Sequence, residues 1–431
     1  MSIASEITSM GNNLKADYEG LVNLGVDLTN VDKNIENIRT CLDSIYTNYP
    51  KVTGTDGTLV TLSNCNKGKL QITEKGNSTQ DGTPTPSSPI SIKNVTGNNN
   101  VVVKGKNILP SLNLEETTKY GVTFTPVYEN GKLQYVNVNG VWDGTVNNAN
   151  IVIGSISFES GKTYTISGLT GWGSTTLQIW TASSTAFPQG NRLQCYNGKV
   201  TRTAQASETC NVQINIYKDQ TYNNVKVYPM VCEENTDDTY EPYVIPQTLP
   251  LNLGSIELNK IGTYQDYIYK NNGNWYKKEY VGKVTFTGAS GENWSKQSSS
   301  TVDKFICQNA FTDRETGTIA LSNYFLYSNE INVIGKMFNA GTTAPYNIVF
   351  CTSAYGETSK TDFTTWLSTH NTIVKYVKAT ATDIQITDTT LISQLEAIDN
   401  MQSYNGTTII TSTYDSANSQ MILGASALKG E

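Results

Sequence analysis

The first 49 residues differ from the rest of the chain in the spacing of their hydrophobic positions. Apolar side chains recur there every seven residues, at Ile7, Leu14, Leu21, Leu28, Ile35 and Leu42, and a second set lies three residues further on. This spacing is typical of helices that associate along an apolar seam. Because the sequence around Gly25 resembles a helix stop followed by a new N-cap, we expect two helices that associate with other copies of the chain. The alternative is a helical hairpin that packs on its own chain.

After Tyr49-Pro50 the pattern changes to short alternating runs broken by Gly, Asn, Asp and Pro, which predict antiparallel strands. The clearest runs lie at 69–72, 101–103, 135–138, 164–166, 177–180, 212–216 and 225–227. Between about 111 and 247 their spacing suits a β-sandwich or jelly roll. Residues 82–89 hold three prolines and cannot supply consecutive ladder donors, so they predict an extended surface connection.

A second β-rich region follows, at 248–431. Two amphipathic stretches interrupt it, and they predict helices near 362–369 and 389–401. The strand pattern resumes directly after Pro242, as if a β domain were interrupted by an insertion, so we expect residues 50–110 to pair with 248 onward. The predicted fold is mainly β: a helical segment at 1–49, a β segment at 50–110, an inserted jelly-roll-like sandwich at 111–247, and a C-terminal β domain at 248–431 with two short helices.

Composition narrows the classes of partner. The chain has 431 residues, 37% of them hydrophobic, and a formal net charge of −7 with no cluster of Lys and Arg, so nucleic acid is not an expected partner. No basic and apolar leader and no run of 18 apolar residues is present, so we expect neither signal-directed export nor membrane insertion. Seven scattered cysteines without a C-x-x-C pair indicate reduced side chains in a protein made in a cytoplasm.

Sequence signals for catalysis are few. His370 is the single histidine, and it follows a predicted helix whose last turn we expect it to cap. The phosphate-loop, hydrolase and dinucleotide signatures are missing, and we predict no cofactor and no metal site.

The stretch YPMVCEENTDDTYEPYV, at 228–244, carries five carboxylates: Glu233, Glu234, Asp237, Asp238 and Glu241. Their spacing matches neither a calcium loop nor a clear glycosidase pair. If Val225, Val227 and Val231 lie on a final strand, residues 233–239 form an exposed excursion, and Pro242 carries the chain out of the domain. We therefore interpret the stretch as a closing turn, with incidental calcium binding and catalysis as the alternatives.

Several stretches resemble one family, the tail-associated minor structural proteins of bacteriophages and prophages from Gram-positive hosts. GNSTQDGTPTPSSPI at 76–90, IKNVTG at 92–97 and VKGKNIL at 103–109 are similar to its G-x-S-x-Q-x-G-T-P-x-P-x-x-P module ending in G-K-N-L. YPMV at 228–231, YEPY at 240–243, GTYQDYIYK at 262–270 and LISQLEA at 391–397 are similar to later segments. The chain departs from the family at 234–239, where ENTDDT replaces a spacer that contains Gly and Ser.

The resemblance implies a non-enzymatic virion protein of the tail fibre, baseplate or receptor-binding group, made in the host bacterial cytoplasm. It also implies a homotrimer that attaches to other virion proteins through residues 1–49. The sandwich resembles carbohydrate-binding jelly rolls, which makes a host-surface glycan the expected ligand. Because aromatic rings stack on sugars, we predict ligand contacts at Trp172, Trp180 and Tyr196, although each of these side chains could equally be core. The alternatives are a head (capsid) fibre, a structural spacer, or a glycan depolymerase that uses Glu233 and Asp238.

Overall fold

The computed structural model describes residues 51–53, 56–57, 59–65, 68–110, 113–169, 174–182, 184–233, 239–298, 302–330, 332–341, 343–352, 359–414 and 418–427. Within these residues the fold is mainly β, with 56% strand and 6% helix, several antiparallel sheets and two helices near the C-terminus. This confirms the predicted β class and the two C-terminal helices. The helices predicted at 1–49 lie outside the described residues.

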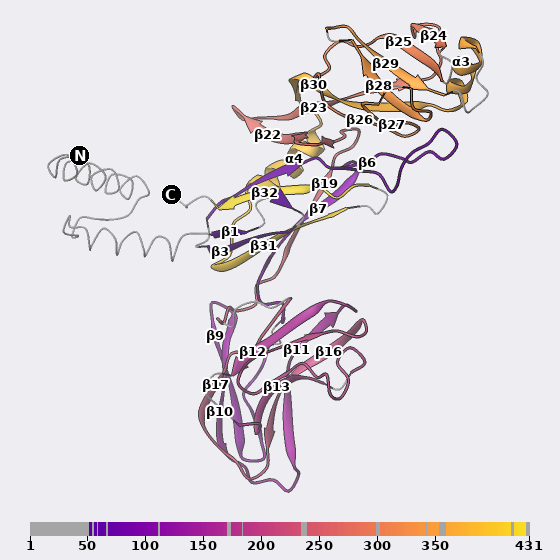
Figure 1. Cartoon of the computed structure of the whole chain (residues 1–431). Helices are drawn as coiled ribbons and strands as arrows, with labels where there is room; N and C mark the ends of the chain where they lie inside the picture. Colours follow the sequence, from indigo (N-terminus) through magenta and orange to yellow (C-terminus); the bar gives the residue numbers. More distant parts are fainter. Residues whose placement is uncertain are drawn as a thin grey trace, which may run out of the picture.

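The strands between 117 and 233 form a body of their own, shown at the bottom of Figure 1, and we call it the central body. One sheet has the order β17-β10-β9-β8, with β8 Thr117–Lys119, β9 Val122–Glu129, β10 Lys132–Val141 and β17 Thr221–Val227. A second has the order β11-β16-β13-β14, with β11 Asn148–Phe158, β13 Leu177–Thr181, β14 Gln194–Cys195 and β16 Glu208–Tyr217. A third has the order β15-β12-β18, with β12 Thr163–Leu169, β15 Gly198–Thr203 and β18 Met230–Glu233.

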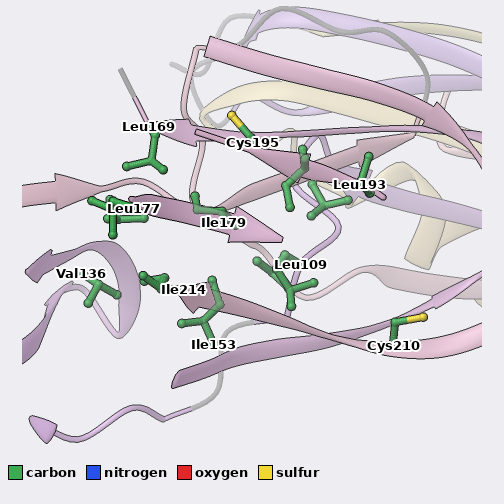
Figure 2. Close-up of a cluster of buried hydrophobic side chains, with 14 of the residues drawn as sticks. Leu109, Val136, Ile153, Leu169, Leu177, Ile179, Leu193, Cys195, Cys210 and Ile214 are labelled. Carbon is green, nitrogen blue, oxygen red and sulfur yellow. The ribbon is translucent and has the colours of Figure 1, made fainter. Parts of the chain in front are cut away.

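The hydrophobic core of the central body lies between these sheets. Figure 2 shows Leu177 and Ile179 of β13 beside Ile214 of β16 and Ile153 of β11, all of them with no exposed surface. Val136 of β10 belongs to the same cluster. Because side chains alternate along a strand, the residues between these apolar positions point to the other face of the sheet. Each buried aliphatic side chain stabilises the body by about 1.5–3 kcal/mol.

The second body is built from both sides of the central insertion (Figure 1). One sheet has the order β1-β3-β31-β7-β19, with β1 Lys51–Thr53, β3 Leu59–Cys65, β7 Asn98–Gly105, β19 Gln247–Asn252 and β31 Gly406–Tyr414. A seven-stranded sheet has the order β2-β32-β4-β22-β23-β30-β26, with β2 Asp56–Gly57, β4 Leu70–Lys75, β22 Tyr267–Asn271, β23 Asn274–Phe286, β26 Ala320–Ser322, β30 Thr372–Gln385 and β32 Ile422–Ala427. The pairing of 50–110 with 248 onward is therefore present: β7 lies between β31 and β19, and β4 lies between β32 and β22.

A five-stranded sheet packs near the helix α3, which spans Lys360–Thr369. It has the order β24-β25-β29-β28-β27, with β24 Trp294–Ser298, β25 Asp303–Phe311, β27 Leu326–Tyr327, β28 Lys336–Ala340 and β29 Tyr346–Cys351. Two small ladders pair β5 Ser78–Thr79 with β6 Lys93–Asn94, and β20 Lys260–Ile261 with β21 Tyr264–Gln265.

The two helices begin and end at residues with clear local causes. α3 (Lys360–Thr369) starts with a capping box between Ser359 and Asp362, and it ends at His370, as expected. The imidazole of His370 stacks on Trp366 at a centroid distance of 4.5 Å. α4 (Thr389–Asp399) is capped by Asp388 and buries Leu391, Leu395 and Ile398 of the predicted apolar stripe. Met401, the last residue of the stripe, is also buried but lies beyond the end of the helix.

Candidate ligand-binding surfaces

The face of the β11-β16-β13-β14 sheet that points away from the core cluster carries amides around Trp180, and two of them, Gln178 and Asn215, are 4% and 2% exposed. Leu177 and Ile179 point into the core, so Gln178 and Trp180 lie on the opposite face. The register places Trp180 between Gln213 of β16 and Gln194 of β14. We call Gln178, Trp180, Arg192, Gln194, Gln213 and Asn215 the amide face.

Three buried polar atoms of the amide face have no hydrogen-bond partner: Trp180 Nε1, Arg192 Nε and Asn215 Oδ1. Leaving a buried donor or acceptor unpaired costs about 1–3 kcal/mol. Native proteins rarely leave such atoms unpaired, so a group of them on one face calls for an explanation. The face thus holds two unpaired donors and one unpaired acceptor.

The three aromatic residues predicted to contact ligand occupy different environments. Trp180 is partly buried, and the guanidinium carbon of Arg192 lies 4.9 Å from its ring centroid. One ring face is therefore covered by a cation–π contact, which leaves less of the ring free for stacking on a sugar. Tyr196 directly follows β14 and is 42% exposed. Trp172 lies outside the described residues.

Two acidic side chains of the 228–244 stretch form structural contacts. Glu233, at the end of β18, pairs with Lys104 of β7 at 2.7 Å. Glu241 accepts hydrogen bonds from the Thr407 backbone N–H at 2.9 Å and from the Thr407 hydroxyl at 2.7 Å, and it pairs with Lys106 at 3.2 Å. These contacts join the two bodies where the chain passes between them. The other three carboxylates, including Asp238, lie outside the described residues.

The expectation that Val225, Val227 and Val231 lie on one final strand is wrong. Val225 and Val227 lie on β17, which pairs with β10, whereas Val231 lies on β18, which pairs with β12. The chain changes sheets at Tyr228-Pro229, because proline has no N–H with which to continue a ladder.

Asn107 connects the G-K-N motif to the Y-E-P-Y motif. It is 4% exposed, and its amide nitrogen donates to the carbonyl oxygens of Pro229 and Glu241 at 3.3 and 3.0 Å. Its Oδ1 accepts from the backbone N–H groups of Leu109 and Val231 at 3.0 and 3.2 Å. One side chain thus satisfies four backbone groups at the place where the chain passes between the central body and the second body. We call this region, around Asn107, Pro229 and Glu241, the junction. The motifs that carry the family resemblance therefore build this junction.

A polar hollow of about 430 Å³ in the second body contains charges that are already paired. Lys277 lies 2.7 Å from Glu279, and Lys283 lies 2.8 Å from Glu257. Behind them Asp266 is fully buried, which raises the pKa of its carboxyl, and it accepts backbone N–H bonds from Tyr280 and Val281. Paired, hydrogen-bonded charges of this kind hold strands in register and leave no free acid or base.

The sequence analysis did not identify a group of exposed aromatic and aliphatic residues at the end of the central body away from the second body. We call Tyr120, Val141, Trp142 and Val146 the distal tip. Tyr120, Val141 and Val146 are 42%, 60% and 41% exposed, and the Tyr120 ring stacks on Trp142 at a centroid distance of 5.0 Å. The opposite end of the same sheet meets β31, because Glu129 and Lys132 line a hollow together with Thr407. The available signal was Tyr120-Gly121, an unusual pair for a two-residue hairpin turn.

Within the described residues, no three His, Cys, Asp or Glu side chains gather as metal ligands. None of the helices in this part of the chain is both long and apolar enough to cross a bilayer. Comparison with known proteins finds no matching family model, no matching curated protein and no matching solved structure.

Proposed function

We propose that this protein is a non-enzymatic virion component of a phage tail fibre or baseplate that binds a glycan on the host cell surface. The observation that carries the proposal is the amide face, where Trp180 Nε1, Arg192 Nε and Asn215 Oδ1 are buried without partners beside Gln194 and Gln213. Amides, an indole N–H and a guanidinium are the groups that recognise a polyhydroxylated ligand.

The architecture supports the same proposal. We interpret the central body as a jelly-roll-like sandwich, an arrangement that presents ligand on one sheet face or on its end loops. The ion pair between Glu233 and Lys104 favours adhesion over hydrolysis, because it gives a structural role to one of the two acids that a depolymerase would use. In this proposal residues 1–49 hold a homotrimer and attach it to other virion proteins. Several copies on one particle raise a weak affinity by about 10²–10⁴.

The test of the amide face is Trp180→Phe, which keeps an aromatic ring and removes the unpartnered N–H. Because that donor has no partner in the free protein, we expect its removal to leave the unfolding midpoint unchanged or slightly higher. We expect binding to polysaccharide extracted from the host cell wall to weaken by about 3- to 10-fold, the value of one hydrogen bond to ligand.

The matched control is Tyr414→Phe, which removes one polar atom from an exposed aromatic residue of the second body. It should bind like the parent protein. Equal binding by the parent, Trp180→Phe and an Arg192→Met variant would contradict the adhesin assignment of this face and would favour a spacer role.

A further inference from the structure

Three two-residue hairpin turns of the chain share one backbone conformation. Asn130-Gly131 joins β9 to β10, Asn272-Gly273 joins β22 to β23, and Tyr120-Gly121 joins β8 to β9. In each turn both residues have positive φ, with values of 49° and 73°, 48° and 80°, and 50° and 72°. Positive φ at both central positions is the signature of a type I′ turn, for which Asn-Gly is the favoured sequence.

Tyr120 is the exception among these turns. A bulky side chain in the left-handed region is a conformational outlier, whereas Asn tolerates it. Such outliers persist only where the surroundings hold them, and they cluster at sites of function. The chain uses Asn-Gly at two turns of the same shape, so turn formation alone does not explain a tyrosine here.

The surroundings of Tyr120 hold its ring in one orientation. The ring stacks on Trp142 with an interplanar angle of 29°, and Trp142 Nε1 donates to the Gly144 carbonyl oxygen at 2.8 Å. The Tyr120 carbonyl oxygen accepts from the Asp143 N–H at 3.0 Å. A Cβ atom at Gly144 would lie 2.3 Å from the Tyr120 ring, so only glycine fits beneath it. The tyrosine is thus pre-oriented, and it remains 42% exposed.

Beside this ring lies a hollow of about 540 Å³, lined by Thr118, Lys119, Tyr120, Asn148, Ala149 and Asn150. Lys119 Nζ donates to the Asn150 carbonyl oxygen at 2.9 Å, which fixes the amine at the wall of the hollow. Asn148 is exposed and Asn150 is partly buried. An aromatic ring, two amides, a hydroxyl and an amine around this open hollow are groups that can contact one sugar ring and its hydroxyls.

The geometry points to a second binding site at the distal tip, which takes a single sugar unit in the hollow, with its apolar face on Tyr120 and its hydroxyls on Asn148, Asn150 and Lys119. This inference rests on the proposed function, because it assigns a further site to the same glycan-binding body. The tip lies on the side of the central body away from the second body, where a surface ligand has access.

The decisive variant is Tyr120→Asn, which restores the turn sequence of Asn130-Gly131 and removes the ring. The purified full-length chain and its variants are applied to a printed array of neutral, N-acetylated and acidic oligosaccharides, and the strongest signal is followed by titration. We expect Tyr120→Asn to weaken binding by about tenfold. Its unfolding midpoint should not fall below that of Tyr120→Ala, because Asn tolerates the left-handed conformation better. The reciprocal variant Asn130→Tyr is the control, which should lower the unfolding midpoint and leave binding unchanged.

The outcomes separate the tip from the amide face. Parent-like binding by Tyr120→Asn, together with weaker binding by Trp180→Phe, overturns the tip site and leaves the proposed function in place. Weaker binding by Tyr120→Asn alone supports the tip and removes the amide face as the main site. An array on which the parent binds nothing counts against both. A Tyr120→Asn variant that has a lower unfolding midpoint than the parent but binds like the parent would assign the tyrosine a purely structural role.

Discussion

Glu74 of β4 offers the clearest link between one buried group and the pH dependence of stability. Its side chain is 1% exposed and follows Leu70 and Ile72 on the face of β4 that joins the core with α4. Neither carboxyl oxygen has a hydrogen-bond partner on another residue, and the backbone of Glu74 itself makes the one contact that lowers the pKa. Burial raises the pKa of Glu74 from 4.5 to about 8, and the negative charge of Asp399 adds to the shift. Glu74 is therefore protonated in the folded protein at neutral pH.

The direction of the Glu74 pKa shift determines whether stability rises or falls with pH. The folded state binds the Glu74 proton more tightly than the unfolded state does, so the stabilisation is complete below pH 4.5 and is lost as the pH rises through 8. At 1.36 kcal/mol for each pKa unit, the free energy of unfolding falls by about 5 kcal/mol between pH 4 and pH 9 from this group alone.

Glu74→Gln removes the titration and keeps the shape of the side chain. We expect urea unfolding, followed by circular dichroism at constant ionic strength, to give similar midpoints for parent and variant at pH 5. At pH 9 the variant should be more stable by several kcal/mol, up to about 5. Glu116→Gln is the control, since it removes one carboxylate from the exposed surface of the central body. Parent and Glu74→Gln profiles that stay parallel from pH 5 to pH 9 would refute the reasoning.

Two further predictions concern the junction and the N-terminal segment. Asn107→Ala leaves the Leu109 and Val231 N–H groups without their acceptor, so we expect a loss of about 2–4 kcal/mol in urea unfolding and faster hydrogen exchange at these two amides. Asn137→Ala is the control: it loses one exposed amide contact and should stay within about 0.5 kcal/mol of the parent in free energy of unfolding. Unchanged hydrogen exchange in Asn107→Ala would count against the role of Asn107 at the junction. A chain without residues 1–49 should keep its β sheets but lose the stable oligomer, and light scattering that shows an unchanged oligomer would refute the seam.

The parts of the fold that the sequence predicts well are those in which periodicity and burial agree. Alternation at 177–180 predicts β13, and the apolar stripe at 391–401 predicts α4, because one face of each element must be buried. That residues 50–110 pair with strands after 248, as β7 does, follows from the interruption of one strand pattern by another. The order of strands within the large sheets does not follow, since alternation marks a strand without naming its neighbours.

The candidate sites depend on contacts between residues that lie apart in the sequence. Arg192 covers one face of Trp180 because the chain returns beside β13 at β14, and no local pattern marks that return. Tyr120 and Trp142 lie 22 positions apart in the sequence and meet only through the β8-β9-β10 register. Aromatic residues can be counted in a sequence, but whether a ring is covered, stacked or exposed is set by its neighbours across the sheet.

The motifs that carry the family resemblance lie at the junction between the two bodies, so the resemblance bears on architecture more directly than on the ligand. Asn107 of the G-K-N motif bonds to the Glu241 carbonyl oxygen, and Lys106 and Thr407 bind the Glu241 carboxylate, so these motifs maintain the junction between two bodies. A junction of this kind needs the same residues whatever the inserted body binds. Tyr120 and Trp180 lie outside those motifs, on surfaces that can change without affecting the junction.

Relatives that share the junction motifs should therefore differ most at the amide face and the distal tip. Swapping the inserted body at 111–246 between two such proteins should transfer glycan preference with it. A chimera that folds and keeps the glycan preference of its recipient would place recognition elsewhere in the chain.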